Sequence, residues 1–201
     1  MKIERVVLEG NQVCLQPLSL DHHKALCEIG LEEELWRWTP YQILTSDQMQ
    51  NYLSEALKEE AEGRALPFVT IEKKNGQIVG STRFGNIDCT HRHVEIGWTW
   101  ITPKWQRSFV NTEAKYLMLK YAFEELCCLR VEFKTDSLNE RSRRALLRIG
   151  GKEEGTFRNH MVTWSGRIRH SVYYSITDAE WSTVKASLEE KLKNSNQYSI
   201  G

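Results

Sequence analysis

A glutamate in the middle of a predicted strand has the position that a general base requires. Glu95 lies between Val94 and Ile96, in a stretch rich in β-branched and aromatic residues. A carboxylate in such a run either faces a polar cleft, where it can accept a proton, or pairs with a cation such as Arg92 or Lys134. The sequence leaves both alternatives open.

A second polar residue is a candidate for proton transfer. His160 is a rival candidate base, because histidine titrates near neutral pH, although a lone histidine more often has a structural role. Ser142 lies one turn into a predicted helix, where a serine hydroxyl can hydrogen-bond the backbone. That helix begins at Asn139, a residue type that commonly caps helices. From the residues alone, Glu95 and His160 are the catalytic candidates.

The segment between residues 101 and 112 predicts an anion site at the start of a helix. A strand ends near Ile101, a loop follows over 102–110, and a helix begins near Asn111. The first N–H groups of a helix lack partners within it and favour a phosphate or pyrophosphate. We expect the amides of residues 107–112 to bind this group. The residues assigned to it are Gln106, Arg107, Ser108, Phe109, Val110, Asn111 and Thr112.

The rest of the pattern predicts the elements that hold these residues in place. Strands are expected at 13–17, 66–72, 78–87, 91–101, 129–135, 157–164 and 168–176. Helices are expected to begin at Asp21, Ser46, Asn111, Asn139 and Thr177 or Asp178. The turn Lys74-Asn-Gly-Gln77 favours positive φ at both of its centres. The order indicates an α/β fold, with a mixed central sheet of about seven strands and helices on both faces.

Composition excludes several classes of function. Lysine plus arginine and aspartate plus glutamate each number 27, so no net positive charge favours direct binding of nucleic acid. No apolar run predicts a membrane span, and charged residues interrupt the N-terminal segment where a signal peptide would lie. The five cysteines form no Cys-x-x-Cys pair, which fits reduced thiols, a cytoplasmic location and no metal site. The 201 residues suit a single domain over 1–201, with a polar tail after about Lys193.

Two segments carry a family resemblance. They are Asn111-Thr-Glu-Ala-Lys115 and the run from Asn139-Glu-Arg-Ser142 to Gly150-Gly-Lys-Glu-Glu-Gly155. On these residues the chain resembles the GNAT acetyltransferases, and within them the RimJ/RimL-like branch, over nearly its whole length. Family members carry Gln/Arg-x-x-Gly-x-Gly/Ala before the helix. Gln106 matches this motif, whereas Phe109 and Asn111 replace the small residues, and we expect Phe109 to turn outward.

The resemblance implies an acetyl-CoA site. In the family, the strands that correspond to about 92–101 and 129–135 splay apart, and the pantetheine arm of the cofactor enters between them. Backbone groups near Trp100 and Ile101 are then expected to hold pantetheine, and an N–H there to polarise the thioester carbonyl. Asn139 corresponds to a cofactor-contacting asparagine. Many members use a tyrosine as the acid where this chain has Leu146, and Ser142 corresponds to its replacement in RimJ/RimL-like proteins.

The resemblance also places an acceptor pocket beneath the segment Leu35-Trp-Arg-Trp-Thr-Pro40. Trp36 and Trp38 either line that pocket or seal the core, and we assign both to the acceptor together with Glu95. The expected function is transfer of acetyl from acetyl-CoA to a primary amine, by direct attack in a ternary complex without a metal. The amine belongs either to a protein N-terminus, such as that of a ribosomal protein, or to a small molecule.

The alternative function comes from another class of protein. Because Phe109 and Leu146 depart from the family pattern, the chain could be a catalytically silent GNAT-fold module that binds CoA or a partner. A homodimer is compatible with either function. Neither involves a membrane.

Overall fold

The computed structural model describes residue 1 and residues 3–197, and one mixed sheet runs through this part of the chain. Its eight strands follow the order β1-β2-β3-β4-β5-β6-β8-β7. They are β1 (Leu8–Glu9), β2 (Val13–Pro17), β3 (Leu66–Glu72), β4 (Gln77–Asp88), β5 (His93–Ile101), β6 (Arg130–Asp136), β7 (Lys152–Val162) and β8 (Ile168–Thr177). The predicted mixed sheet is confirmed. The strand beyond the seven expected is β1, whose two residues are too few to show an alternating pattern.

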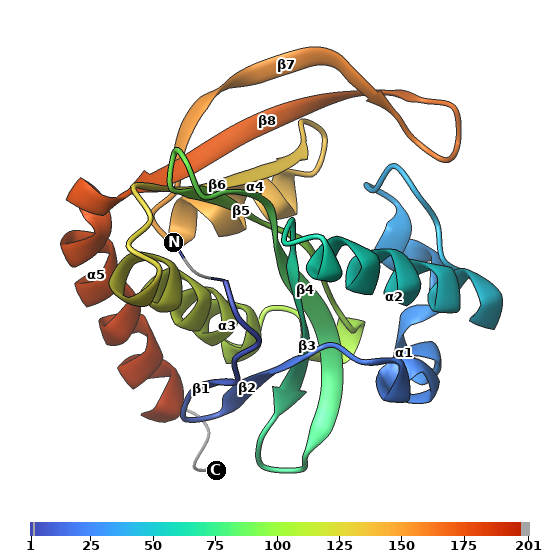
Figure 1. Ribbon diagram of the computed structural model, residues 1–201, viewed down its shortest axis with the longest axis horizontal. Helices are drawn as coiled ribbons and strands as arrows, with labels where there is room; N and C mark the ends of the chain where they lie inside the picture. Colours follow the sequence, from blue (N-terminus) through green and yellow to red (C-terminus); the bar gives the residue numbers. More distant parts are fainter. Residues whose placement is uncertain (2, 198–201) are drawn as a thin grey trace.

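Helices cover both faces of the sheet, as predicted (Figure 1). They are α1 (His23–Gly30), α2 (Ser46–Ala61), α3 (Phe109–Lys120), α4 (Glu140–Arg148) and α5 (Asp178–Gln197). Short 3-10 turns lie at Leu20–His22, Glu33–Trp36 and Pro103–Trp105, and a π-helical turn at Tyr121–Glu125 extends α3.

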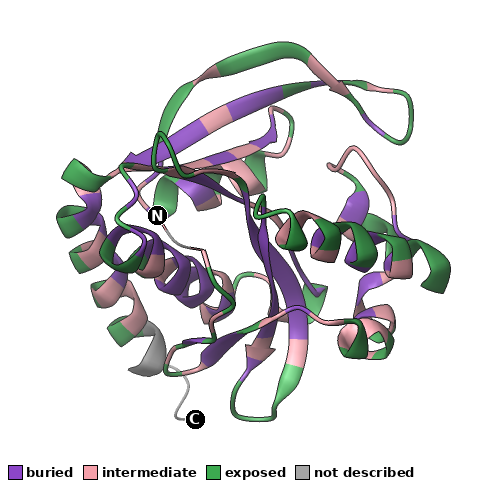
Figure 2. Cartoon of the chain, viewed as in Figure 1, coloured by how far each residue is buried: buried purple, intermediate pink, exposed green. Residues whose placement is uncertain are grey.

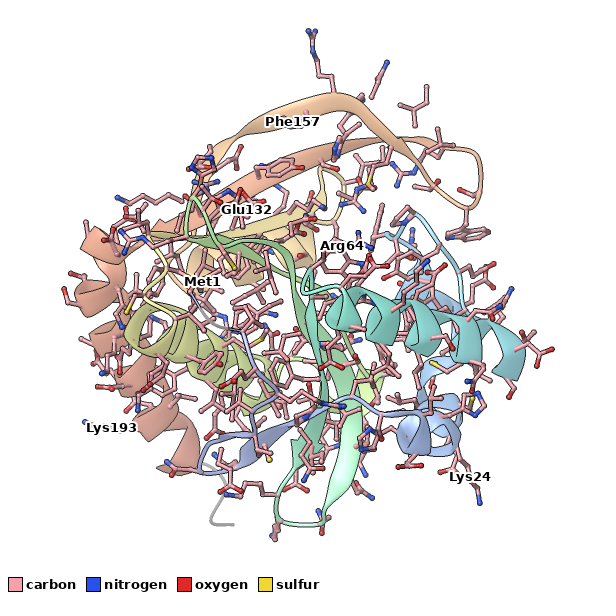
Figure 3. The ribbon with its side chains drawn as sticks, in the orientation of Figure 1. Met1, Lys24, Arg64, Glu132, Phe157 and Lys193 are labelled. Carbon is pink, nitrogen blue, oxygen red and sulfur yellow. The ribbon has the colours of Figure 1, made fainter. Side chains whose placement is uncertain are left out.

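The core lies in two layers, one on each side of the sheet. One apolar cluster packs α1 and α2 against the sheet through residues such as Leu26 and Leu53. A larger cluster packs α3, α4 and α5 against the opposite face, through Met118, Ile149 and Leu188 among others. Buried residues run along the central strands, whereas β7 is largely exposed (Figure 2). Side chains fill the space between the sheet and the helices on both sides (Figure 3).

Capping side chains fix the helix starts. Helix α2 begins at Ser46 as predicted, and Thr45 caps it, because the Thr45 side chain accepts the Gln48 N–H while Gln48 reaches back to the cap. Ser19 rather than Asp21 precedes the first helical turn. Asn139 caps α4 as predicted, accepting the Ser142 N–H at 3.1 Å.

The turn between β3 and β4 and the start of β7 also differ from the prediction. Gly76 has φ of 65°, but Asn75 is absent from the residues with positive φ, so only one centre of the Asn-Gly turn has the expected sign. Strand β7 begins at Lys152 instead of 157. The first residues of β7 are polar and exposed, so they show no alternating apolar pattern from which a strand could be predicted. The strand is stabilised instead by its hydrogen-bonded ladder to β8.

No helix in the described part of the chain is both long and apolar enough to cross a lipid bilayer.

Candidate active site

The parallel pair β5 and β6 opens into a cleft. Their ladder joins His93–Glu95 to Arg130–Glu132, and beyond these residues the two strands are not paired with each other. A cavity of about 800 Å³ occupies the opening. Its walls include Gly97, Trp98, Thr99, Trp100 and Ile101 from β5 and Phe133, Lys134 and Thr135 from β6. The predicted separation of these strands is therefore confirmed.

A β-bulge bends β5 at the cleft. Ser81 of β4 pairs with Trp100 and Arg83 pairs with Gly97, so the register shifts between them. Trp98 lies in the bulge with φ of 50°. A bulge leaves backbone groups unpaired and redirects the strand. On the cleft side, the backbone of residues 98–101 is not paired with β6, because the ladder between β5 and β6 ends at Glu95; this is where we expected Trp100 and Ile101 to act.

The loop before α3 has the geometry predicted for an anion site, with a shifted helix start. The helix begins at Phe109, and Ser108 is its N-cap, accepting the Val110 N–H at 3.3 Å. The N–H groups without a partner in the helix therefore belong to residues 108–111, and among them the Val110 N–H is taken by the Ser108 side chain; the Thr112 N–H falls inside the helix. Arg107 adopts φ of 62° just ahead of the cap.

The side chain of Gln106 connects this loop to β5 and to α4 by hydrogen bonds. Its amide nitrogen donates to the Ile101 carbonyl at 2.8 Å, and its amide oxygen accepts from Arg141 of α4. The side chain thereby folds the loop back on the end of β5 and holds an arginine at the cleft. Gln106, Arg107, Ser108 and Asn111 all line the cavity.

Three other residues assigned to the anion site have different surroundings. Phe109 does not turn outward as expected: its ring packs edge-to-face on Trp105, 5.9 Å away, and against the core. Val110 is fully buried in the core. Thr112 is also buried, and its hydroxyl accepts from Arg148 at 2.9 Å. Burial of the apolar Phe109 ring against the core is more favourable than its exposure to water. The side chains of these three residues do not line the cavity.

The sequence analysis missed an arginine cluster on α4. Arg141, Arg144 and Arg148 line the same cavity. Their spacing of three and four residues places them on one helix face, and this spacing was a readable signal. Together with Arg107 they bring positive charge to the end of the cleft nearest the helix mouth.

Glu95 lies at the inner end of the cleft and is 2% exposed. Its Oε2 accepts from Lys134 Nζ at 2.9 Å and from Asn86 Nδ2 at 2.6 Å. Its Oε1 faces Gly97, where a β-carbon would approach within 2.9 Å, so only glycine fits without displacing the carboxylate. The sequence left open whether Glu95 pairs with a cation or faces a polar cleft. In the structure it does both, because it binds Lys134 and lines the cavity.

The other two catalytic candidates differ in their access to the cleft. Ser142 lines the cavity from the first turn of α4, as does its capping partner Asn139. His160 on β7 does not line it: its Nδ1 lies 2.9 Å from Ser171 Oγ, and its ring contacts Phe157 and Tyr173. Burial, and then the positive charges of Lys134 and Arg169, lower the pKa of His160 below its usual value.

The two tryptophans expected at the acceptor pocket both line the cavity but differ in burial. Trp36 is fully buried, donates to the Gly30 carbonyl at 2.9 Å and packs on Trp100. Trp38 is half-buried, and the guanidinium groups of Arg37 and Arg167 lie 5.0 and 5.7 Å from the centre of its ring. Trp36 is therefore part of the core, whereas Trp38 is the more exposed of the two.

The tip of the β7–β8 hairpin covers this tryptophan segment (Figure 1). Trp164 Nε1 donates to the Trp36 carbonyl and Arg169 to the Trp38 carbonyl, both at 3.1 Å. These contacts join segments more than a hundred residues apart in the sequence. They form one wall of the cleft at the end that holds Glu95.

Lys115 is a second residue that the sequence analysis missed. It lies on α3, is 4% exposed and still lines the cavity. Its Nζ donates to Thr99 Oγ1 at 2.7 Å and to Thr82 Oγ1 at 3.3 Å. Burial lowers the pKa of Lys115 from 10.5 to about 7.

Within the described residues, no cluster of His, Cys, Asp or Glu has the composition of a metal site.

Comparison with known proteins identifies the family. The acetyltransferase (GNAT) domain matches residues 12–152. A GCN5-related N-acetyltransferase from Brucella melitensis superimposes with a TM-score of 0.88 at 31% identity, over 96% of this chain and 87% of that chain. Mycobacterium smegmatis RimJ, solved in complex with CoA-disulfide, superimposes with a TM-score of 0.79 at 25% identity, over 92% of this chain and 91% of that one.

A curated relative points to the same branch. It is the Bacillus subtilis protein named "Putative ribosomal N-acetyltransferase YdaF", which is 35% identical over 111 residues. The match spans 55% of this chain and 60% of that protein, less than two thirds of its length. With the splayed strands and the helix-mouth loop, these likenesses show that the chain belongs to the GNAT family, as an acetyl-CoA-dependent N-acetyltransferase of the RimJ/RimL-like branch.

Proposed function

We propose that this chain transfers the acetyl group of acetyl-CoA to the N-terminal amine of a protein, by direct attack of the amine on the thioester. The observation that carries the proposal is the continuous cleft between β5 and β6. It runs from an arginine-lined helix mouth at Ser108 to the buried carboxylate of Glu95. One end suits a polyanion, and the other offers a base.

The residues present fit acetyl-CoA. The pyrophosphate would lie on the N–H groups of residues 108–111, where the helix dipole favours negative charge. Arg107, Arg141, Arg144 and Arg148 would neutralise the remaining phosphate charge, and bidentate guanidinium contacts suit phosphates. The unpaired backbone of β5 around Trp100 and Ile101 would hold the pantetheine amides as an added strand does.

Activation of the acceptor is assigned to Glu95. A free amine is largely protonated at pH 7 and must lose that proton before it attacks. Oε2 of Glu95 is engaged by Lys134 and Asn86, so Oε1 is the oxygen proposed to take the proton, directly or through a water. An N–H of the bulged segment would polarise the thioester carbonyl. Ser142 and Asn139 would contact the cofactor from α4.

The acceptor class is inferred from the mouth of the cleft and from the relatives. Glu34 and the half-buried Trp38 lie at this end, where Glu34 would attract a cationic amine and Trp38 would contact the residue that carries it. The relative named for ribosomal N-acetylation supports a protein acceptor. A small-molecule amine is the competing acceptor class.

An acceptor panel tests the proposal, with release of free CoA thiol as the readout. The panel contains peptides with a free N-terminus, the same peptides with a blocked N-terminus and an internal lysine, and small-molecule amines. Free N-termini should react fastest. Faster turnover of small amines would assign the chain to that class. Binding of CoA with no turnover of any amine would favour the catalytically silent module.

Two variants separate the base role of Glu95 from its ion pair. Glu95→Gln should lower kcat by about 10²–10⁴ while affinity for acetyl-CoA stays nearly constant. Lys134→Met also removes the ion pair but leaves the carboxylate, so it should retain most of kcat. Equal losses in the two variants would show that the ion pair, and not the base, is what matters, and His160 would become the candidate.

A further inference from the structure

The ammonium of Lys115 is a buried cation without a buried anion. Its two hydrogen bonds both go to hydroxyl groups, those of Thr99 and Thr82. In the part of the chain that the structure describes, no carboxylate lies within salt-bridge distance of it. Burying an unpaired charge is costly, so a lysine at such a position requires an explanation beyond packing. A ligand that brings negative charge into the cleft would supply the missing partner.

The position of Lys115 indicates which part of the ligand this is. Thr99, which holds the ammonium, is exposed in the cleft and follows the bulge at Trp98. This is the point where β5 and β6 have separated, beyond the paired residues His93–Glu95. The arginines that line the cavity from α4 are Arg141, Arg144 and Arg148, whereas the ammonium of Lys115 is held at Thr99 of β5. The anionic partner inferred for Lys115 is therefore at the strand gap and not at the helix mouth.

Lys115 also lies on the same face of the sheet as α4. The Thr112 hydroxyl accepts from Arg148 at 2.9 Å and ties α3 to α4, and both helices contribute to one apolar cluster. Leu146 of α4, which cannot donate a proton, lines the cavity that Lys115 lines. On this face of the cleft, the ammonium of Lys115 beside Thr99 is a group that can donate a proton, whereas the Leu146 side chain of α4 is not.

We propose that Lys115 donates the proton that the CoA sulfur takes up when the thioester is cleaved. This rests on the proposed function. The acceptor nitrogen bonds to the carbonyl carbon, the C–S bond breaks, and sulfur leaves with the bonding pair and takes a proton from Lys115 Nζ. The nitrogen gives one proton to Glu95 as the amide forms, Glu95 releases it to solvent, and solvent returns one proton to the neutral Lys115, so protons and charge balance.

The surroundings of Lys115 suit such a donor. Burial brings its pKa to about 7, close to the operating pH, where a donor of protons is most effective. The groups that face it are hydroxyls: Thr82 from β4, which also contacts the Met118 sulfur of α3, and Thr99 from β5.

Two carboxylates of the described residues line the cavity, and both have other partners: Glu95 binds Lys134, and Glu34 lies 3.5 Å from Arg37. Among the arginines of the cavity, Arg148 and Arg141 of α4 bind Thr112 and Gln106, and Arg169 of β8 binds the Trp38 carbonyl. None of the carboxylates in the described part of the chain is paired with Lys115.

Titration of the CoA thiol in its binary complex tests the proposal without an acceptor. Thiolate formation is followed by ultraviolet absorption while the pH is raised, with CoA saturating the protein. The bound thiol should have a pKa about 1 to 3 higher in Lys115→Met than in the wild type, because the neighbouring cation is gone. The matched control is Lys120→Met, the same substitution at an exposed position of α3. It should leave the thiol titration unchanged.

Turnover provides the second readout. Lys115→Met should lower kcat by about 10²-fold, whereas KM for acetyl-CoA stays nearly constant. Ser142→Ala, tested beside it, reports the rival donor. If CoA binds and its thiol titrates identically in Lys115→Met and the wild type, Lys115 is not the donor. If CoA does not bind the wild type at all, the proposed function itself fails, and the two failures are distinct.

Discussion

At the scale of single residues, α3 buries two side chains of opposite charge, Glu113 and Lys115, which have different roles. Glu113 is 4% exposed, and its carboxylate accepts the backbone N–H groups of Asn11 and Gln12 in the turn between β1 and β2. Burial raises the pKa of Glu113, but its hydrogen bonds fasten the N-terminal hairpin to the helix. The glutamate of the Asn-Thr-Glu-Ala segment thus serves the fold, while Lys115 faces the cleft.

Lys115 should reduce stability in a pH-dependent way. Its folded-state pKa of about 7 lies below its ordinary 10.5. The folded state thus disfavours the charged form, and the cost is complete below about pH 7. Between these two values the unfolded state binds more protons, so stability rises with pH. Lys115→Met should therefore stabilise the protein by several kcal/mol at pH 6, since each pKa unit is about 1.4 kcal/mol. The gain should shrink toward pH 10.

Urea unfolding of both proteins across this pH range measures the difference in free energy. Lys120→Met, at the exposed end of α3, gives the baseline for removal of a solvated lysine. A stabilisation that does not change with pH would show that Lys115 stays charged in the folded state up to its ordinary pKa, contrary to its buried hydroxyl surroundings.

At the scale of elements, the start of α3 decides whether the loop can bind phosphate without the small residues common in the family. Ser108 caps the helix in an extended conformation, with φ of −99° and ψ of −173°. Phe109 packs inward on Trp105, so its bulk is removed from the mouth while its N–H remains there. The departure from the glycine pattern thus preserves the backbone donors.

Phe109→Pro tests the mouth directly. Proline is well suited to the first helical position, and the extended Ser108 tolerates a following proline, so the helix should form. Loss of one N–H donor to a phosphate costs about 1.5–3 kcal/mol, hence acetyl-CoA affinity should fall roughly 10- to 150-fold. Phe109→Ala removes the same ring and keeps the N–H. Calorimetry that finds equal affinities in the two variants would place the pyrophosphate elsewhere.

At the scale of the whole molecule, the acceptor end of the cleft exists only because distant segments meet. The hairpin tip, through Trp164 and Arg169, holds the carbonyls of Trp36 and Trp38. The half-buried Arg167 adds an ion pair with the buried Asp136 at the end of β6. These contacts connect the tryptophan segment, β6 and the hairpin around one opening.

This arrangement predicts different effects for the two tryptophans. Trp36→Ala leaves a cavity in the core and should destabilise the protein by about 3–5 kcal/mol. Trp38→Ala should leave stability nearly unchanged and raise KM for the acceptor about tenfold, equivalent to about 1.4 kcal/mol, with acetyl-CoA affinity constant. Thermal unfolding and steady-state kinetics on both variants measure this. An unchanged acceptor KM in Trp38→Ala would remove Trp38 from the acceptor site.

The sequence by itself determined the order of the elements and the fold class, because apolar periodicity and caps are local signals. Asn139 at the start of α4 and the loop after Gln106 were readable in this way. Tertiary structure decided which side chains share the cleft. The partner of Glu95 and the hairpin contacts of Trp36 and Trp38 depend on residues far apart in the sequence, as does the packing of Phe109 against the core. Lys115 shows the limit most clearly: a lysine on a helix is ordinarily solvated, and only packing of α3 against β4 and β5 buries it.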